Sequence, residues 1–302
     1  MPRDQCYTPL SGELLVGRNI AASVRDRLFN LTQKRGGNFQ KVLVLYALER
    51  LLYRLGKSQY ADRFLLKGAL LFSVWYTTPH RVTRDADFLG FGESDKDTIT
   101  QIFREIASLP CDDGVLFKHA EIQVEPIRKL ADYGGLTVLI PAVINGARCM
   151  TKVDIGFGDV VTPPAERITY PVFLSDMPAP QIRAYSVYTV IAEKLHAIVE
   201  HGMTNSRMKD YYDLAFLLDR ETFDADTLKK AVHSTFKRRG RQLNGTPVGL
   251  TDEFATDISR VIVWEGFLRK NELPYTTLPE IILKVRTGLA QLLSFEHTGE
   301  EN

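Results

Sequence analysis

Apolar residues recur at helical spacing along most of the chain. Ile20, Val24 and Leu28 are each four residues apart, the spacing of one buried helix face, and Gly36-Gly37-Asn38 then breaks the pattern. The segment that opens Ser94-x-x-Asp97 resembles a capping box. After the first helix we expect helices over about Phe39–Leu55, Ala69–Tyr76, Ser94–Ser108, Val187–Glu200, Asp210–Leu218, Asp226–Phe236, Thr251–Leu268 and Leu278–Leu293.

Extended segments lie between these helices in the first half of the chain. Asn145-Gly146, the strongest short hairpin signal, predicts that its flanking segments pair antiparallel. The proline-rich stretch Thr162–Pro180 separates this half from helices alone. We therefore expect an α/β (α+β) fold, a mixed sheet flanked by helices over residues 1–180 and a helical region over 181–302. The expected strands are Arg63–Lys67, Thr83–Leu89, Glu121–Glu125, Gly135–Ile144 and Ala147–Ile155.

Composition indicates an ordinary globular protein. The chain has 302 residues, 44% hydrophobic and 25% charged, and its formal net charge of +1 excludes a globally basic nucleic-acid coat. No apolar run approaches the roughly 20 residues of a membrane span, and Met1–Leu15 lacks the apolar core of an export signal. Cys6, Cys111 and Cys149 are too scattered for a disulfide framework. We expect a cytoplasmic protein.

The segment Thr83-Arg84-Asp85-Ala86-Asp87-Phe88 carries the first candidate chemistry. In a strand, Asp85 and Asp87 point to one face, and two converging carboxylates suit Mg²⁺ (or Mn²⁺) with substrate phosphates. Just before it, Lys67-Gly68-Ala69 forms a turn whose glycine lets backbone amides approach those phosphates. The alternative is a solvated strand edge, which is the usual place for such acidic pairs.

Two later segments carry further charged residues. In Lys152-Val153-Asp154, the lysine and the aspartate share a strand face, so Asp154 would complete a metal site or orient an attacking hydroxyl. Lys194 lies on an apolar helix and is placed to neutralise phosphate charge. Arg207 and Lys209 precede Asp210, which could pair with them. The alternatives are a half-buried strand with a polar outer face and a capped helix N-terminus.

In order and spacing, these segments resemble the AbiEii/AbiGii-type nucleotidyltransferase toxins, a branch of the polymerase-β-like superfamily that includes the MenT toxins. The resemblance runs from about Asn19 to Leu218. K-G-A-L-L-F and T-R-D-A-D-F look like the first motif, K-V-D-I-G-F-G-D like the second, A-E-K-L-H-A like the third and R-M-K-D-Y-Y-D-L like the fourth. The first family motif commonly has G-G or G-S where this chain has Gly68-Ala69, so a serine hydroxyl is absent.

The resemblance implies a metal-dependent enzyme that transfers a nucleoside monophosphate from an NTP, often to the 3′ end of tRNA, and an antitoxin partner protein. It implies that Asp85 and Asp87 bind the metal and that Lys194 and Asp210 belong to the active site. We group Lys67, Gly68, Ala69, Asp154, Arg207 and Lys209 as nucleotide-binding. Two alternatives remain open: transfer to a protein or small molecule, and an inactive binding module, which the Gly68-Ala69 departure favours.

A late basic cluster is a candidate RNA contact. The run Arg238-Arg239-Gly240-Arg241 follows an amphipathic helix and would meet phosphates through its charge, although a solvated helix end is equally consistent with the sequence. The cluster comprises Lys229, Lys230, Lys237, Arg238, Arg239 and Arg241.

Overall fold

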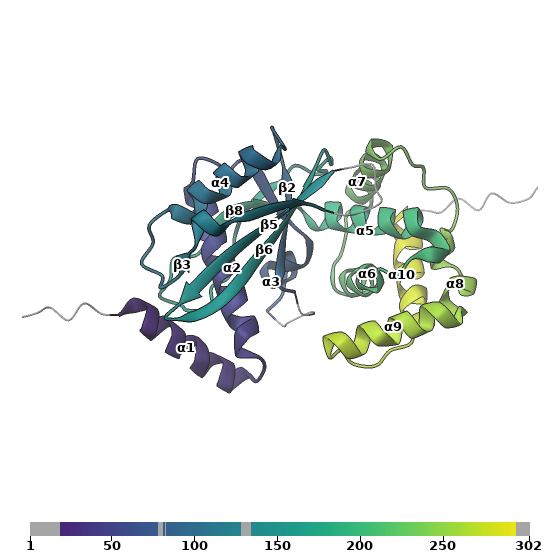
Figure 1. Cartoon of the computed structure of the whole chain (residues 1–302). Coiled ribbons are helices and arrows are strands. Elements are labelled where there is room, and N and C mark those ends of the chain that lie inside the picture. Colours follow the sequence, from purple (N-terminus) through teal and green to yellow (C-terminus); the bar gives the residue numbers. More distant parts are fainter. Residues whose placement is uncertain (1–18, 78–80, 82, 128–133, 294–302) are drawn as a thin grey trace, which may run out of the picture.

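A computed structural model describes residues 19–77, 81, 83–127 and 134–293, so the segment Met1–Leu15 and Cys6 lie outside the described residues. The strands form one mixed sheet. They are β1 (Phe64–Lys67), β2 (Asp85–Gly90), β3 (Leu116–Phe117), β4 (Gln123–Pro126), β5 (Gly135–Ile144), β6 (Ala147–Phe157), β7 (Glu166–Thr169) and β8 (Gln181–Ala184). Helices flank this sheet and continue beyond it, which confirms the α/β (α+β) fold class (Figure 1).

The strand order is β3-β5-β6-β2-β1-β8-β7, and β4 also pairs with β5. β2 runs parallel to β6 and β1 parallel to β8, whereas the other pairs are antiparallel. The hairpin of β5 and β6 turns at Asn145-Gly146 as predicted, with Ile144 opposite Ala147. β2 and β1 therefore occupy the middle of the sheet, with their ends supported on both sides.

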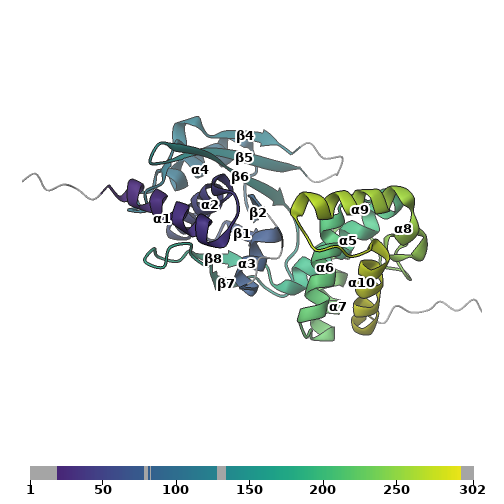
Figure 2. The ribbon, with the colours of Figure 1, turned by 90° about the horizontal axis from the view of Figure 1, so that it is seen from below.

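The helices fall into two groups (Figures 1 and 2). Those of the first half are α1 (Ile20–Arg35), α2 (Phe39–Lys57), α3 (Phe72–Trp75) and α4 (Lys96–Ser108). Those of the second half are α5 (Val187–His201), α6 (Met208–Arg220), α7 (Ala225–Arg238), α8 (Asp252–Thr256), α9 (Ile258–Asn271) and α10 (Leu278–Leu293). Among the residues described, no helix has the length and apolarity needed to cross a membrane.

One face of the sheet forms the core with α2 and α4. Phe64 on β1 meets Phe88 on β2 and Phe103 on α4, with ring centroids 6.0 and 5.5 Å apart. On β6, the thiol of Cys149 lies 3.9 Å from the carbonyl oxygen of Leu43 on α2. Because side chains alternate along a strand, the residues between these buried ones point to the opposite face. That opposite face carries the charged residues.

Several local predictions were wrong. The expected helix over Ala69–Tyr76 is a 3₁₀ turn (Gly68–Leu71) that leads into the short α3. The cap of α4 is Asp95, whose carboxylate accepts from the Thr98 amide at 2.9 Å, and not Ser94. The expected helix over Thr251–Leu268 is α8 and α9, because Asp257 ends one helix and caps the next. β3, β7 and β8 were not predicted.

Candidate active site

The carboxylates of β2 lie on the open face of the sheet, as predicted. The parallel register sets Asp87 beside Asp154 and Asp85 beside Lys152, while the antiparallel register sets Asp87 opposite Lys67. Side chains on paired positions share a face, so these five residues point the same way. The side chain of Asp85 is 45% exposed and that of Asp154 25% exposed. The middle of the sheet thus presents three carboxylates to one space.

Gly68 is required by the position of Asp87. A Cβ atom at residue 68 would lie 2.1 Å from the Asp87 Oδ2 atom, and the backbone there has φ +73°, which favours glycine. The turn after β1 therefore packs directly against the Asp87 carboxylate. The family's serine position is Ala69, which lies inside this same turn. The turn is short, with four 3₁₀ residues followed by the four residues of α3.

Lys152 bridges two of the three carboxylates. Its ammonium donates to Asp154 Oδ2 at 2.7 Å and to Asp85 Oδ2 at 3.3 Å. The hydroxyl of Thr137 donates to the other oxygen of Asp154 at 2.6 Å. Asp154 therefore has both oxygens occupied, whereas Asp85 shares one lysine and is half open to water.

Lys194 meets the second group of charges, on α5 and α6. Its ammonium, which is nearly buried, donates to Asp210 at 3.1 Å and to Asp213 at 2.6 Å. Arg207 donates to the other oxygen of Asp210 at 2.6 Å, so Asp210 does pair with Arg207 and is not the helix cap. Arg81, just before β2, donates to both oxygens of Asp213 at 2.7 and 2.9 Å. Three cations and two carboxylates form this helix-side cluster.

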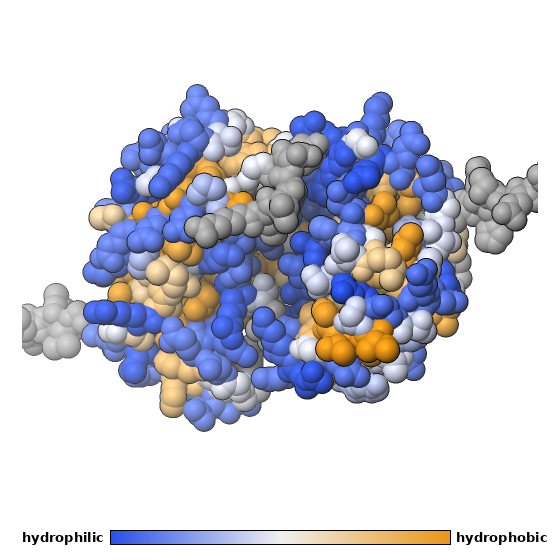
Figure 3. Space-filling view, turned by 45° about the vertical axis from the view of Figure 1, so that its right-hand side comes forward, coloured by the Kyte–Doolittle hydropathy of each residue, from blue (hydrophilic) through white to orange (hydrophobic). Residues whose placement is uncertain are grey.

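The two groups of charges act on each other. Burial raises the pKa of Asp87, and the charges of Lys209, Lys67 and Lys194 oppose that rise, while Asp154 adds to it. The pKa of Lys209 is lowered, first by burial and then by Arg207. Lysines from α5 and α6 therefore contribute positive potential at the carboxylates of β2. Hydrophilic residues gather along the hollow between the two halves of the molecule (Figure 3).

Lys67 points to the same face but is held by other acids. Its ammonium lies 3.0 Å from Glu193 on α5 and 3.2 Å from Asp159 after β6. Burial alone would lower the pKa of Lys67, but Glu193, Tyr185 and Asp159 raise it above its ordinary value. Arg239 lies 2.9 Å from the same Asp159 and 3.5 Å from Glu193. This bridging cluster (Lys67, Asp159, Glu193 and Arg239) connects β1 and the end of β6 to α5 and α7.

The basic cluster on α7 and directly after it is divided by the structure. Arg239 belongs to the bridging cluster, Arg238 donates to the Gly158 carbonyl at 2.6 Å, and Arg241 pairs with Glu200 at 2.7 Å. Lys229 and Lys237 instead line a hollow of about 740 Å³ with His233 and Arg241. Only part of the predicted cluster therefore faces a space that RNA could enter.

A divalent cation fits the carboxylates of β2. Mg²⁺ binds through one or two carboxylates together with substrate phosphates and water, and Asp85 and Asp87 supply two oxygen donors on one strand face. The described residues contain no group of three or more acidic, histidine or cysteine side chains that could hold a metal alone. The donor set thus suits a cation that arrives with a phosphate ligand.

Arg81 and the role of Asp213 were missed from the sequence. Asp213 is fully buried and three residues after Asp210, the spacing that puts two residues on one helix face. That spacing was a usable signal, but the sequence-based prediction of the site did not include Asp213. Arg81 stands alone four residues before Asp85, in a segment without periodicity, and nothing in the sequence links it to α6.

Comparisons with known proteins identify the fold and the family. Two solved structures share the fold at 15% sequence identity: JHP933 from Helicobacter pylori, with a TM-score of 0.53 over 85% of this chain and 93% of that chain, and a second H. pylori protein, described as a nucleotidyltransferase, with 0.52 over 88% and 100%. No curated protein matches the chain. The family model for the nucleotidyl transferase AbiEii toxin of type IV toxin–antitoxin systems matches residues 50–279. The chain therefore belongs to the AbiEii family of nucleotidyltransferase toxins.

Proposed function

We propose that this protein is a toxin that transfers a nucleoside monophosphate from an NTP to the 3′ end of tRNA and thereby blocks translation. It acts in the cytoplasm, and a cognate antitoxin protein restrains it. Family membership supports the toxin and the class of reaction. The observation that carries the proposal is the shared face of Asp85, Asp87 and Asp154 on the sheet. Lysines of α5 and α6, among them Lys194 of the helix-side cluster, add positive charge near that face.

The reaction is a substitution at the α-phosphorus of the NTP. The acceptor oxygen forms a bond to that phosphorus, the bond to the β-phosphate oxygen breaks, and pyrophosphate leaves. A cation bound by Asp85 and Asp87, Mg²⁺ or Mn²⁺, would supply charge neutralisation for the triphosphate. Gly68 keeps the adjoining turn against the Asp87 carboxylate, and the backbone amides of Gly68 and Ala69 would meet the phosphates there. The charge of Lys209 acts on Asp87, and Arg207 bonds to Asp210 within the helix-side cluster.

Two carboxylates were candidates for orienting the acceptor hydroxyl. Asp210 is 1% exposed, and Lys194 and Arg207 hold its pKa below the ordinary value although burial alone would raise it. A buried, doubly paired carboxylate is a weak base, so we assign Asp210 to positioning Lys194 and Arg207. Asp154 is also bonded twice, by Lys152 and Thr137, but its side chain is 25% exposed on the open face beside Asp87. An acceptor can therefore reach it, and we assign it the hydroxyl proton.

The hollow beside α7 supports an RNA acceptor. Lys229, Lys237 and Arg241 line it with His233, and the exposed lysines are free to follow a phosphate backbone. Arg239 lies in the chain between Lys237 and Arg241, which line the hollow, and its guanidinium pairs with Asp159 of the bridging cluster. Acceptors of another class, a protein hydroxyl or a small molecule, have no comparable feature in their favour.

The direct test is mass spectrometry of total tRNA after incubation with the protein, a divalent cation and each NTP in turn. We expect a mass increase of one or more nucleotides at the 3′ end with one preferred NTP, and none with Asp87→Asn. Unmodified tRNA together with labelled protein or a labelled metabolite would contradict the tRNA assignment. If tRNA, proteins and metabolites all remain unmodified, the proposal that this protein is an active nucleotidyltransferase is contradicted.

A second experiment addresses the hollow. Lys229→Gln with Lys237→Gln should weaken tRNA binding. The logarithm of the affinity should also fall less steeply with the logarithm of the salt concentration, by the equivalent of roughly two phosphate contacts. Lys96→Gln with Lys230→Gln removes two exposed lysines that do not line the hollow, and serves as the matched control. Equal slopes for the two double variants would reject the hollow as an RNA contact.

A further inference from the structure

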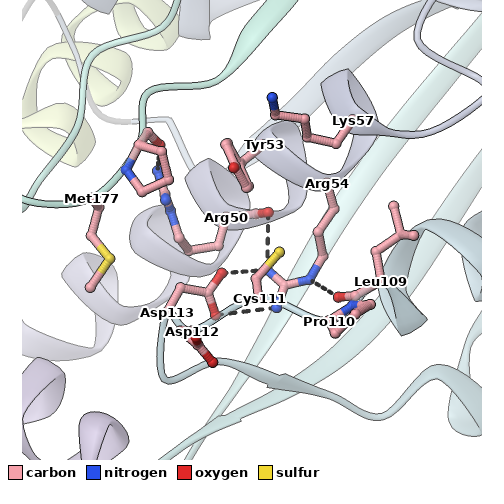
Figure 4. A pocket seen from close by; sticks show the side chains of 11 residues that line it. Arg50, Tyr53, Arg54, Lys57, Leu109, Pro110, Cys111, Asp112, Asp113 and Met177 are labelled. Atoms are coloured by element: carbon pink, nitrogen blue, oxygen red, sulfur yellow. Dashed lines mark hydrogen bonds and ion pairs between the residues drawn. The ribbon is translucent and has the colours of Figure 1, made fainter.

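A cavity of about 390 Å³ lies on the side of the molecule away from the carboxylates of β2. Its walls are the C-terminal half of α2, the segment 109–113 after α4 and the segment 177–178 (Figure 4). Because α2 and α4 cover the buried face of the sheet, the full thickness of the sheet separates this cavity from Asp85 and Asp87. Its size falls in the range of small-molecule sites, from roughly 300 Å³ upward.

Arg54 is already satisfied within the protein. It donates to both oxygens of Asp113 at 2.5 and 3.2 Å and to the Leu109 carbonyl at 3.0 Å. These bonds tie the segment after α4 to α2. Arg54 therefore builds the wall of the cavity, and its charge is offset by Asp113.

Arg50 is in a different position. It is fully buried, and its Nη2 atom donates to the Pro178 carbonyl at 3.0 Å and lies 2.6 Å from Glu49. Its Nε and Nη1 atoms are buried and have no hydrogen-bond acceptor among the described residues. A buried donor without a partner is costly, and buried guanidinium groups are normally fully bonded. This part of the chain thus lacks an acceptor that Arg50 requires.

The surroundings of Arg50 add positive charge and an aromatic ring. Its guanidinium lies 5.3 Å from the centre of the Tyr53 ring, and the Lys57 ammonium lies 5.8 Å from the same ring. Burial raises the pKa of Glu49 to about 7, so near neutral pH Glu49 offsets Arg50 only in part. Asp112 is exposed to water. Leu109 and Met177 supply apolar surface on the remaining walls.

We propose that this cavity binds a small organic anion, a carboxylate or a phosphate, whose acid group bonds to Arg50 and Lys57 and whose apolar part packs against Leu109 and Met177. The site is independent of the proposed transfer reaction, since none of its residues lies in the candidate active site. Arg50 would hold the acid group through charge-assisted hydrogen bonds, and Lys57 would add positive charge at the rim.

Benzoate and phenyl phosphate are suitable probes, with benzyl alcohol as the neutral counterpart of benzoate. Calorimetry on the full chain should show saturable binding of at least one anion, and no binding of the alcohol. Cys111 lines the cavity and is partly accessible, so its alkylation at pH 8.5, followed by peptide mass spectrometry, reports binding at this place and not in the active site. The bound anion should slow that alkylation.

Variants locate the acid group. Lys57→Met alters the rim, and Glu49→Gln with Arg50→Gln replaces both buried partners together, which avoids leaving one charge alone. We expect a loss of affinity of about tenfold or more in the double variant and a smaller loss in Lys57→Met. Lys96→Met, exposed on α4, should bind as the unaltered protein does. If the double variant does not fold, the affinity of Lys57→Met and the protection of Cys111 from alkylation by the bound anion test the proposal.

Three results would overturn the proposal: neither anion binds saturably, the alcohol binds as well as benzoate, or binding leaves Cys111 alkylation and the Lys57→Met affinity unchanged.

Discussion

The two groups of charges in the candidate active site differ in how far the protein satisfies them. On the sheet, Asp85 is 45% exposed and shares one lysine, and the pKa of Asp87 stays raised by burial although nearby lysines oppose the rise. On the helices, Asp210 and Asp213 are 1% and 0% exposed, and each bonds to two cations. On the sheet side, the carboxylates are left with charge that a metal ion and substrate can neutralise. On the helix side, the carboxylates are already paired with cations of the protein.

This difference separates function from stability. Carboxylates that the protein does not fully pair with cations can be replaced by neutral residues without loss of stability. Removing one member of a buried ionic cluster, in contrast, leaves its partners unpaired. Mutations on the sheet side should therefore affect transfer, and mutations on the helix side should affect folding as well.

The largest effect is expected on the sheet side. Asp87→Asn should reduce nucleotide transfer by about 10⁴-fold, because the charge that holds the cation is lost. Its melting temperature should stay at or above that of the unaltered protein, since burial already disfavours the charged form of Asp87. Labelled-NTP transfer and thermal unfolding measure the two quantities. Asp97→Asn, exposed on α4, is the control; transfer undiminished in Asp87→Asn would remove Asp87 from the site.

The next effect is expected on the helix side. Asp213→Ala should lower the free energy of unfolding by about 3 to 5 kcal/mol, because Lys194 and Arg81 lose a shared buried partner. Denaturant unfolding gives this value, and Asp85→Ala, at a half-exposed position, should change it by under about 0.5 kcal/mol. Similar losses in the two variants would mean that the two sides do not differ as described.

A pH effect tests the contact between α5 and the end of α7. His196 lies 3.3 Å from Arg239, and burial followed by Arg239 lowers its pKa to about 4 from 6.5. Because the pKa of His196 is lower in the folded than in the unfolded state, the neutral imidazole contributes its full stability above pH 6.5. This contribution to the free energy of unfolding is lost as the pH falls toward 4. The loss should be on the order of 2 to 3 kcal/mol.

His196→Leu should remove this part of the pH dependence, measured by denaturant unfolding between pH 7 and 4. His233→Leu, at an exposed position on α7, should leave it as it was. The same slope in all three proteins would show that His196 does not couple pH to the stability of this contact.

The smallest effect concerns Lys152. Its ammonium competes with a cation for Asp85 and Asp154, so Lys152→Met should lower the metal concentration for half-maximal transfer severalfold, or about 1 kcal/mol. A titration of Mg²⁺ or Mn²⁺ in the transfer assay gives this concentration. A higher requirement would instead place Lys152 on the substrate.

The sequence predicted those parts of the site that depend on local pattern. Alternation along β2 placed Asp85 and Asp87 on one face, and Asn145-Gly146 fixed the hairpin that carries Asp154. It did not predict contacts between distant segments, such as Arg81 with Asp213 or Lys67 with Glu193, because these depend on how α5 and α6 dock on the sheet. β7 and β8 were missed because they lie within and directly after the proline-rich stretch Thr162–Pro180, which indicates loop and not strand.

The roles of the two sides can be tested most directly by anomalous diffraction from crystals grown with Mn²⁺ and a non-hydrolysable NTP analogue. We predict a manganese peak bonded to Asp85 and Asp87, with the triphosphate between them and the helix-side lysines. Manganese bound elsewhere, or a triphosphate far from both β2 and α6, would contradict the proposed division between the sheet and the helices.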